Sequence, residues 1–191
     1  MIHRKSFYSG MAISFALIAT LLIGWIGLHF HRIMPVVNAN PKAKNYTAPK
    51  NKDIHQAVTS LERLYHLTKF FGMDTYSAKA IGAAGKALSL KTDEASKLQA
   101  KYFYLKSIEE AQKVAASKSG NTTVIQKVDP LLDAYLNYSL FLNDSGHKTQ
   151  ARQTLRRAKK MVEQKEMPKD LQSHKIEDIN NALHKMNLKK I

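Results

Sequence analysis

The 191-residue sequence contains no cysteine. This absence excludes disulfide frameworks, thiolate zinc sites, iron–sulfur clusters, cysteine nucleophiles and lipidation on a cysteine. Glycine and proline are scarce, at eight and five residues, so the chain is not of low complexity. It also lacks G-x-S-x-G, a phosphate loop ending in Lys-Ser/Thr, H-E-x-x-H and a dinucleotide fingerprint. We therefore expect no enzymatic activity and no cofactor.

Acidic residues are absent before Asp53, although the first 52 positions carry seven of the 30 Lys and Arg. Residues 53–191 hold the other 23 cations against all 15 Asp and Glu, a net charge of +8 within a total of +15. Such an imbalance does not specify a fold, but it favours attraction to anionic surfaces.

The longest uncharged stretch runs from residue 6 to residue 30 and is nearly all apolar at its centre. About 20 such residues suffice for a helix to cross the hydrocarbon core of a bilayer. Tyr8 and Trp25 lie toward the two ends, as interfacial aromatic residues do, and Arg4 and Arg32 flank the stretch. The pattern predicts a short basic tail at 1–5 and a transmembrane helix at 6–30.

Two fates of this segment are open. Its length favours an uncleaved signal anchor, whereas the residues before Asn40 resemble a cleavage site after Ala39 that would release a secreted domain. Arg4 and Lys5 favour a domain outside the cytoplasm, but cations on the other side leave a cytoplasmic domain as an alternative. Residues 31–52, with three prolines and no apolar period, predict a stiff, basic, extended linker.

Small residues recur at every fourth position of the apolar segment. They would put one narrow face against another membrane helix, unless they are a coincidence in a segment rich in small residues; they are Ala12, Ala16, Thr20 and Gly24.

From Asp53 onward the apolar residues recur at helical spacing, which predicts an all-α domain over 53–191. Six helices are expected. The first begins at Asp53 with a capping box and ends at Gly72; the third begins at Asp93; the fourth begins at Asp129-Pro130. The expected buried stripe of the first helix includes Phe71, and that of the third helix contains Leu98, Tyr102, Leu105, Ile108, Ala111 and Ala115.

The domain contains an internal similarity at an offset of 71 residues, which aligns Leu61–Thr92 with Leu132–Glu163. Ala80 then matches Ala151, and Ala87 matches Ala158. Large–x₂–large spacing before the turn and small residues at the helix crossing resemble the tetratricopeptide repeat family, in segments 146–161 and 78–88. Small residues at a crossing let two helix backbones approach closely. Gly82 and Gly85 have the same interpretation.

The resemblance implies an array of antiparallel helix hairpins whose first helices line a groove for a protein partner. The groove positions would be Tyr65, Lys69, Leu136, Asn137 and Leu140. Tyr65, Leu136 and Leu140 are equally compatible with core positions. Several members of this family with one N-terminal membrane helix act beside secretion or translocation machinery.

A second candidate surface is a basic cluster on the fifth helix of the domain, consisting of Arg152, Arg156, Arg157, Lys159 and Lys160. It would contact anionic lipid, a cell-wall polymer or nucleic acid, unless it is simply a solvated face. Nucleic acid is the weakest of these because interleaved stacking aromatics are absent. No metal site is expected, since His29/His31 and Glu62/His66 provide only two ligands each.

We therefore expect a single-pass membrane protein whose helical-repeat domain binds another protein, as an accessory subunit of an envelope or translocation-type complex. The alternative is a membrane-tethered polyanion-binding protein that uses its basic surface.

Overall fold

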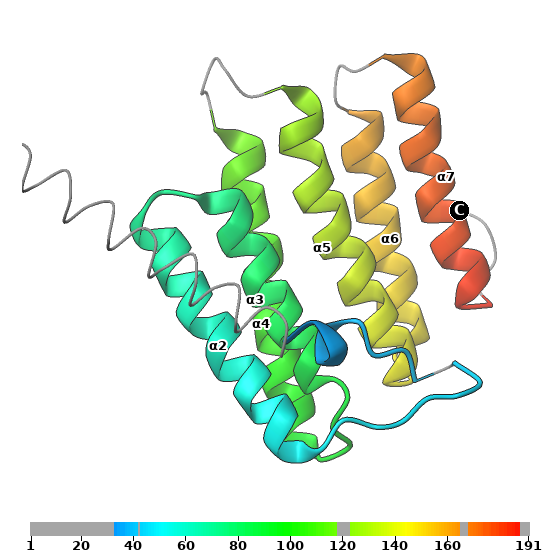
Figure 1. The fold of residues 1–191 in the computed structure, drawn as a ribbon. Helices are drawn as coiled ribbons and strands as arrows, with labels where there is room; N and C mark the ends of the chain where they lie inside the picture. Colours follow the sequence, from blue (N-terminus) through cyan, green and yellow to red (C-terminus); the bar gives the residue numbers. More distant parts are fainter. Residues whose placement is uncertain (1–32, 42, 118–122, 165–167, 188–191) are drawn as a thin grey trace, which may run out of the picture.

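The computed structural model describes residues 33–41, 43–117, 123–164 and 168–187, and this part of the chain contains helices but no strand. The prediction of an all-α domain is confirmed. Figure 1 shows six helices: α2 (Asn51–Phe70), α3 (Asp74–Leu88), α4 (Glu94–Ala116), α5 (Val124–Asp144), α6 (Lys148–Glu163) and α7 (Lys169–Lys185).

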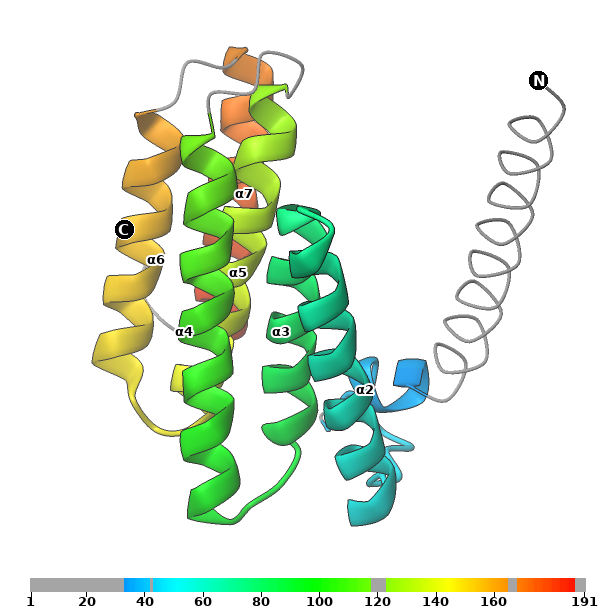
Figure 2. The ribbon, with the colours of Figure 1, turned by 90° about the vertical axis from the view of Figure 1, so that its left-hand side faces the viewer.

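Consecutive helices run in opposite directions and each packs against the next (Figures 1 and 2). Helix α5 also contacts α3 and α7, so these three helices form one layer, with α4 and α6 on its other side. Helix α2 packs along α3 at the end of the array and reaches α4 only through long side chains. The array is therefore a series of hairpins with a closed layer in the middle.

Side chains cap two of the helices. Asp93 begins α4 as predicted, because its carboxylate accepts a hydrogen bond from the Ser96 N–H. Helix α5 begins at a reciprocal capping box between Thr123 and Gln126. The predicted start at Asp129-Pro130 is wrong: the helix begins six residues before Pro130, so the proline lies in its interior. The predicted capping box at Asp53 is also wrong, since α2 begins at Asn51 without a side-chain cap.

Gly72 and Gly146 end α2 and α5 with the same turn. Both have positive φ, at 67° and 84°. In both, the glycine N–H and the next N–H donate back to the last turn: Gly72 to Lys69 and Met73 to Thr68, and Gly146 to Asn143 and His147 to Leu142. This is the Schellman arrangement, which needs a residue tolerant of left-handed backbone at that single position. The predicted end of the first helix is confirmed.

These two turns define a different internal register from the one the sequence suggests. The glycines are 74 residues apart, whereas the sequence alignment used 71. At the offset of 74, buried residues of one hairpin match buried residues of the other: Val58 with Leu132, Ile81 with Leu155, Ala84 with Ala158 and Leu88 with Val162. A shift of three residues keeps nearly the same helix face, so apolar spacing alone could not distinguish the two registers.

Helices α3 and α4 form the closest contact of the array because α3 presents glycine to α4. A β-carbon at Gly85 would lie 3.2 Å from the Ala100 carbonyl oxygen and 3.3 Å from the Phe103 β-carbon. One at Gly82 would lie 2.8 Å from the Ser107 hydroxyl, which donates to the Ala78 carbonyl at 2.8 Å. The expected role of both glycines in helix packing is confirmed.

The segment that precedes α2 is not an extended linker throughout, as predicted. Residues 33–37 are helical, and Ile33 and Val36 are 8% and 3% exposed within the hydrophobic core. Figures 1 and 2 show this segment beside α2 and α3. Irregular backbone of the predicted kind is found only beyond it, toward Lys50.

Among the described helices, none is long and apolar enough to cross a membrane. The segment predicted to do so, residues 6–30, lies outside the described residues, as do Ala12, Ala16, Thr20 and Gly24.

Candidate interaction surfaces

The exposed large hydrophobic residues of the described chain fall into three places. Four surround the turn between α2 and α3, three follow the outer face of α4, and two, Val124 and Ile125, begin α5. We call the first group the apolar turn; it consists of Phe70, Phe71, Met73 and Tyr76.

The apolar turn holds its side chains in solvent on a fixed backbone. Phe70, Phe71 and Tyr76 are 84%, 59% and 60% exposed. The two phenylalanine rings pack edge to face with their centroids 5.3 Å apart, which leaves most of both rings uncovered. The backbone hydrogen bonds at Gly72 define the turn between them. A contiguous exposed patch of this kind is typical of a surface that another molecule covers.

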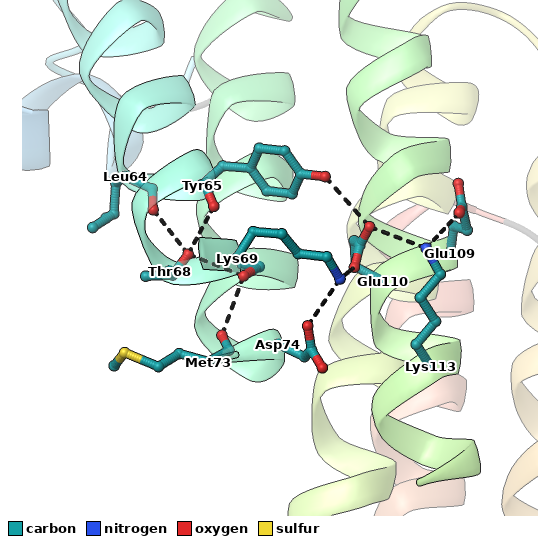
Figure 3. A network of polar contacts seen from close by, with 10 residues as sticks. Leu64, Tyr65, Thr68, Lys69, Met73, Asp74, Glu109, Glu110 and Lys113 are labelled. Carbon is teal, nitrogen blue, oxygen red and sulfur yellow. Dashed lines mark hydrogen bonds and ion pairs between the residues drawn. The ribbon is translucent and has the colours of Figure 1, made fainter. Parts of the chain in front are cut away.

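Beneath the apolar turn, a network of charged groups ties α2, α3 and α4 together (Figure 3). The Lys69 ammonium on α2 bonds to Asp74 Oδ1 at 2.9 Å and to the Glu110 carboxylate on α4. Lys113 lies 3.2 Å from Glu110, and the Tyr65 hydroxyl donates to Glu110 Oε1 at 3.3 Å. Glu110 is 3% exposed, so a buried carboxylate is surrounded by two cations and a hydroxyl.

Burial alone would raise the pKa of Glu110, but the hydrogen bonds from Lys69 and Lys113 hold it below its usual range. The pKa of Lys69 is raised, chiefly by its hydrogen bond to Glu110 and then by the bond to Asp74. Both shifts stabilise the ionised pair. The network therefore positions the turn and does not resemble an acid–base dyad, which needs a group that exchanges protons near neutral pH.

The second hairpin supplies an internal comparison for the apolar turn. At the offset of 74 residues, Phe70 and Phe71 correspond to Asp144 and Ser145, Met73 to His147, and Tyr76 to Gln150. Both turns have the same glycine geometry and the same backbone hydrogen bonds. Polar residues therefore suffice to make this turn, so the four apolar side chains serve something other than its backbone.

The outer face of α4 carries Leu98, Tyr102 and Leu105, at 67%, 55% and 46% exposure. The sequence predicts these three as part of a buried stripe, and that prediction is wrong, because α4 buries Phe103, Tyr104 and their neighbours against α3 and α5. The Lys106 ammonium lies 5.3 Å from the centroid of the Tyr65 ring and 5.5 Å from that of Tyr102. One cation thus joins the α4 face to α2.

The structure does not bring the five predicted groove residues together. Tyr65 is buried and bonds to Glu110, and Lys69 is paired with Glu110 and Asp74. Leu136 and Leu140 are half-buried against the core and Asn137 is exposed, all on α5. Helices α2 and α5 do not pack against each other. An odd number of helices, α3 to α5, separates the two positions in the zigzag, so they face different layers.

The predicted basic surface lies on α6. Arg156, Arg157 and Lys160 are exposed, and Arg152 and Lys159 are half-buried. Lys159 lies 3.9 Å from Glu163, whereas in the described part of the chain no ion pair involves Arg156, Arg157 or Lys160. The five cations therefore do share one helix and remain available to solvent over most of it.

Metal ligation finds no support in the residues that the structure describes, where no three His, Asp or Glu side chains gather. His29 and His31 lie outside these residues.

The sequence analysis missed the apolar turn, because it assigned Phe71 to the buried stripe of its helix. The available signal was the pair Phe70-Phe71 directly before a helix-ending glycine, where the second hairpin has Asp-Ser.

The helical array, its apolar turn and its basic face define a class of protein, an all-α array with exposed surfaces suited to binding. Comparison with known protein families, with curated proteins and with solved structures finds no match.

Proposed function

We propose that this protein is a single-pass membrane protein whose helical-hairpin array, of the tetratricopeptide-like kind, binds another protein as an accessory subunit of an envelope or translocation-type complex. Residues 6–30 are the anchor, and the apolar turn is the principal contact with the partner. The domain lies outside the cytoplasm.

The single observation that carries this proposal is the difference between two equivalent turns. Both hairpins use the same backbone, yet only the first exposes two phenylalanines, a methionine and a tyrosine. Exposed apolar area of this size costs solubility and does not serve the turn itself, whereas aromatic and methionine side chains are enriched at protein interfaces.

An uncleaved anchor has its own support. Cleavage after Ala39 would remove Ile33 and Val36, two side chains that are buried in the core of the domain. Their loss would expose apolar surface and leave a void, which destabilises a small domain. This argument favours retention of the whole N-terminal segment over a secreted form.

Site-specific photo-crosslinking in cells tests the proposal. A photoreactive phenylalanine analogue replaces Tyr76 in one variant and Gln150, its structural equivalent, in another. We expect a discrete cross-linked protein from position 76 and none from position 150. Adding Phe70→Asp, Phe71→Ser and Met73→His to the first variant should reduce that product at least tenfold. Equal cross-linking from both positions, or a product that survives the three substitutions, would count against the apolar turn as a contact.

A second candidate function, polyanion binding, rests on the exposed α6 cations that lack ion pairs. Binding of this kind weakens steeply with salt because counterions are released. Replacing Arg156, Arg157 and Lys160 with glutamine should then abolish retention on vesicle-free anionic polymer at low salt. Unchanged retention of that variant would eliminate this function and leave protein binding as the proposal.

A further inference from the structure

Ile33 and Val36 connect the predicted membrane segment to the core of the domain with almost no slack. We infer that the face of the domain that holds residues 33–52 lies directly on the bilayer surface. The inference rests on the proposed function, because it takes residues 6–30 as the anchor. It adds that the domain is seated against the lipid headgroups and does not hang from a flexible linker.

The first argument is length. The predicted span ends at Phe30, and Ile33 is already buried in the domain core. Three residues extend at most about 10 Å, at roughly 3.5 Å each. The headgroup layer on each side of a bilayer is itself about 5–8 Å thick. The pocket that buries Ile33 therefore lies within or immediately beside the headgroup layer.

The second argument is that the contact at Ile33 is built into the fold. Residues 33–37 are helical, the Asn38 N–H donates to the Met34 carbonyl at 2.9 Å, and Val36 is 3% exposed. If residues 31–52 were instead a free coil, their 22 positions would separate the domain from the membrane by about 25 Å, at 5–6 Å times the square root of the residue number. The burial of Ile33 and Val36 removes that freedom.

The third argument is charge. Residues 33–52 contain no Asp or Glu, and Lys44, Lys50 and Lys52 are all exposed. A segment of exposed lysines without carboxylates is attracted to anionic headgroups and is not repelled by them. The part of the domain that the tether brings to the bilayer is thus the part whose charge suits that location.

The absence of cysteine from the whole chain makes the test direct. The full-length protein is reconstituted in vesicles of phosphatidylcholine and phosphatidylglycerol that contain lipid with a nitroxide on its headgroup. A single fluorophore is attached at N45C, which is exposed in the segment, or at K169C, which is exposed at the start of α7. Figure 1 shows that α7 starts at the opposite end of the array from this segment. We expect at least threefold stronger quenching at position 45; equal quenching would overturn the inference.

Two insertions separate seating from simple proximity along the chain. Ten Gly/Ser residues between Arg32 and Ile33 should lower quenching at position 45 at least twofold. The same insertion between Tyr46 and Thr47, which leaves Ile33 and Val36 in place, should not. If the first insertion changes nothing, or if both reduce quenching alike, the burial of Ile33 does not seat the domain and the inference is wrong.

Failure of the anchor itself would be visible separately. Protein without an inserted segment would not float with the vesicles after a high-salt, high-pH wash. Such a result would overturn the proposed anchor, whereas a floating protein with equal quenching at the two positions would overturn only the seating.

Discussion

The two hairpins α2–α3 and α5–α6 share their turn and their buried face but differ in what surrounds them. Both end the first helix with a glycine at positive φ, and both bury an aliphatic or alanine residue at matching positions. The first exposes apolar side chains at its turn and rests on the Glu110 network, whereas the second has a polar turn. The shared features explain the fold, so the differing features are the ones to examine for function.

The outward faces of the second helices differ as well. Gly82 and Gly85 of α3 correspond to Arg156 and Lys159 of α6 at the offset of 74 residues. The glycines are covered by α4, whereas Arg156 is exposed and Lys159 half-buried. The same position of the hairpin is thus a helix contact in one copy and a basic surface in the other.

The largest effect should come from disrupting the α3–α4 contact. Replacing Gly85 with leucine introduces a side chain where even a β-carbon lies 3.2 Å from a backbone oxygen. We expect a loss of about 3 kcal/mol in the free energy of unfolding, through overpacking. Lys159→Leu, the equivalent change in the second hairpin, should cost less than about 1 kcal/mol, since that face is not packed against a helix. Urea unfolding of the full chain in mild detergent, followed by circular dichroism, measures both; equal losses would contradict the register of 74.

The Glu110 network should contribute the next largest effect, and it has no counterpart in the second hairpin. Glu110→Gln keeps the shape but removes the charge that Lys69 and Lys113 bond. Hydrogen bonds to charged groups contribute about 1.5–3 kcal/mol, so we expect a loss of about 2 kcal/mol at pH 7. A change below about 0.5 kcal/mol would mean that the network is solvated in the folded protein.

The same network sets an acid dependence. Because the pKa of Glu110 is lowered on folding, its contribution is complete above the unfolded-state pKa of about 4.3 and is lost as the pH falls below that value. Stability of the wild-type protein should therefore drop more steeply between pH 5 and the acid limit than that of Glu110→Gln. Parallel pH profiles of the two proteins, measured by thermal unfolding, would contradict this assignment.

The turn glycines should behave alike despite their different neighbours. A β-carbon at Gly72 or Gly146 meets nothing within 4 Å, so alanine at either position suffers only from the left-handed backbone. We expect about 1 kcal/mol of destabilisation in both variants. A much larger loss at Gly72 would indicate that the apolar turn stabilises the fold and is not merely displayed by it.

The sequence alone predicts the all-α class, the helix order and the glycine that ends α2, because these depend on local spacing and on single residues. It misplaces the start of α5, since Pro130 resembles a first-turn proline and the capping signal of Thr123 and Gln126 lies earlier. It also predicts a groove from positions on α2 and α5. Which layer a helix joins depends on how many helices intervene, and residue spacing carries no information about that.

Burial on α4 shows a second limit. Leu98, Tyr102 and Leu105 are apolar at helical spacing, as Phe103 and Ile108 are, but only the latter face α3 and α5. Periodicity identifies an apolar face without saying whether the protein itself covers it. The apolar turn escaped for the same reason.

The most direct test is the unfolding free energy of a variant that carries the second turn in place of the first: Phe70→Asp, Phe71→Ser, Met73→His and Tyr76→Gln. If the apolar turn serves a partner and not the fold, the full chain should keep its stability within about 0.5 kcal/mol, as surface substitutions do. A loss of about 2 kcal/mol or more would show that these side chains hold the domain together, and would contradict the account.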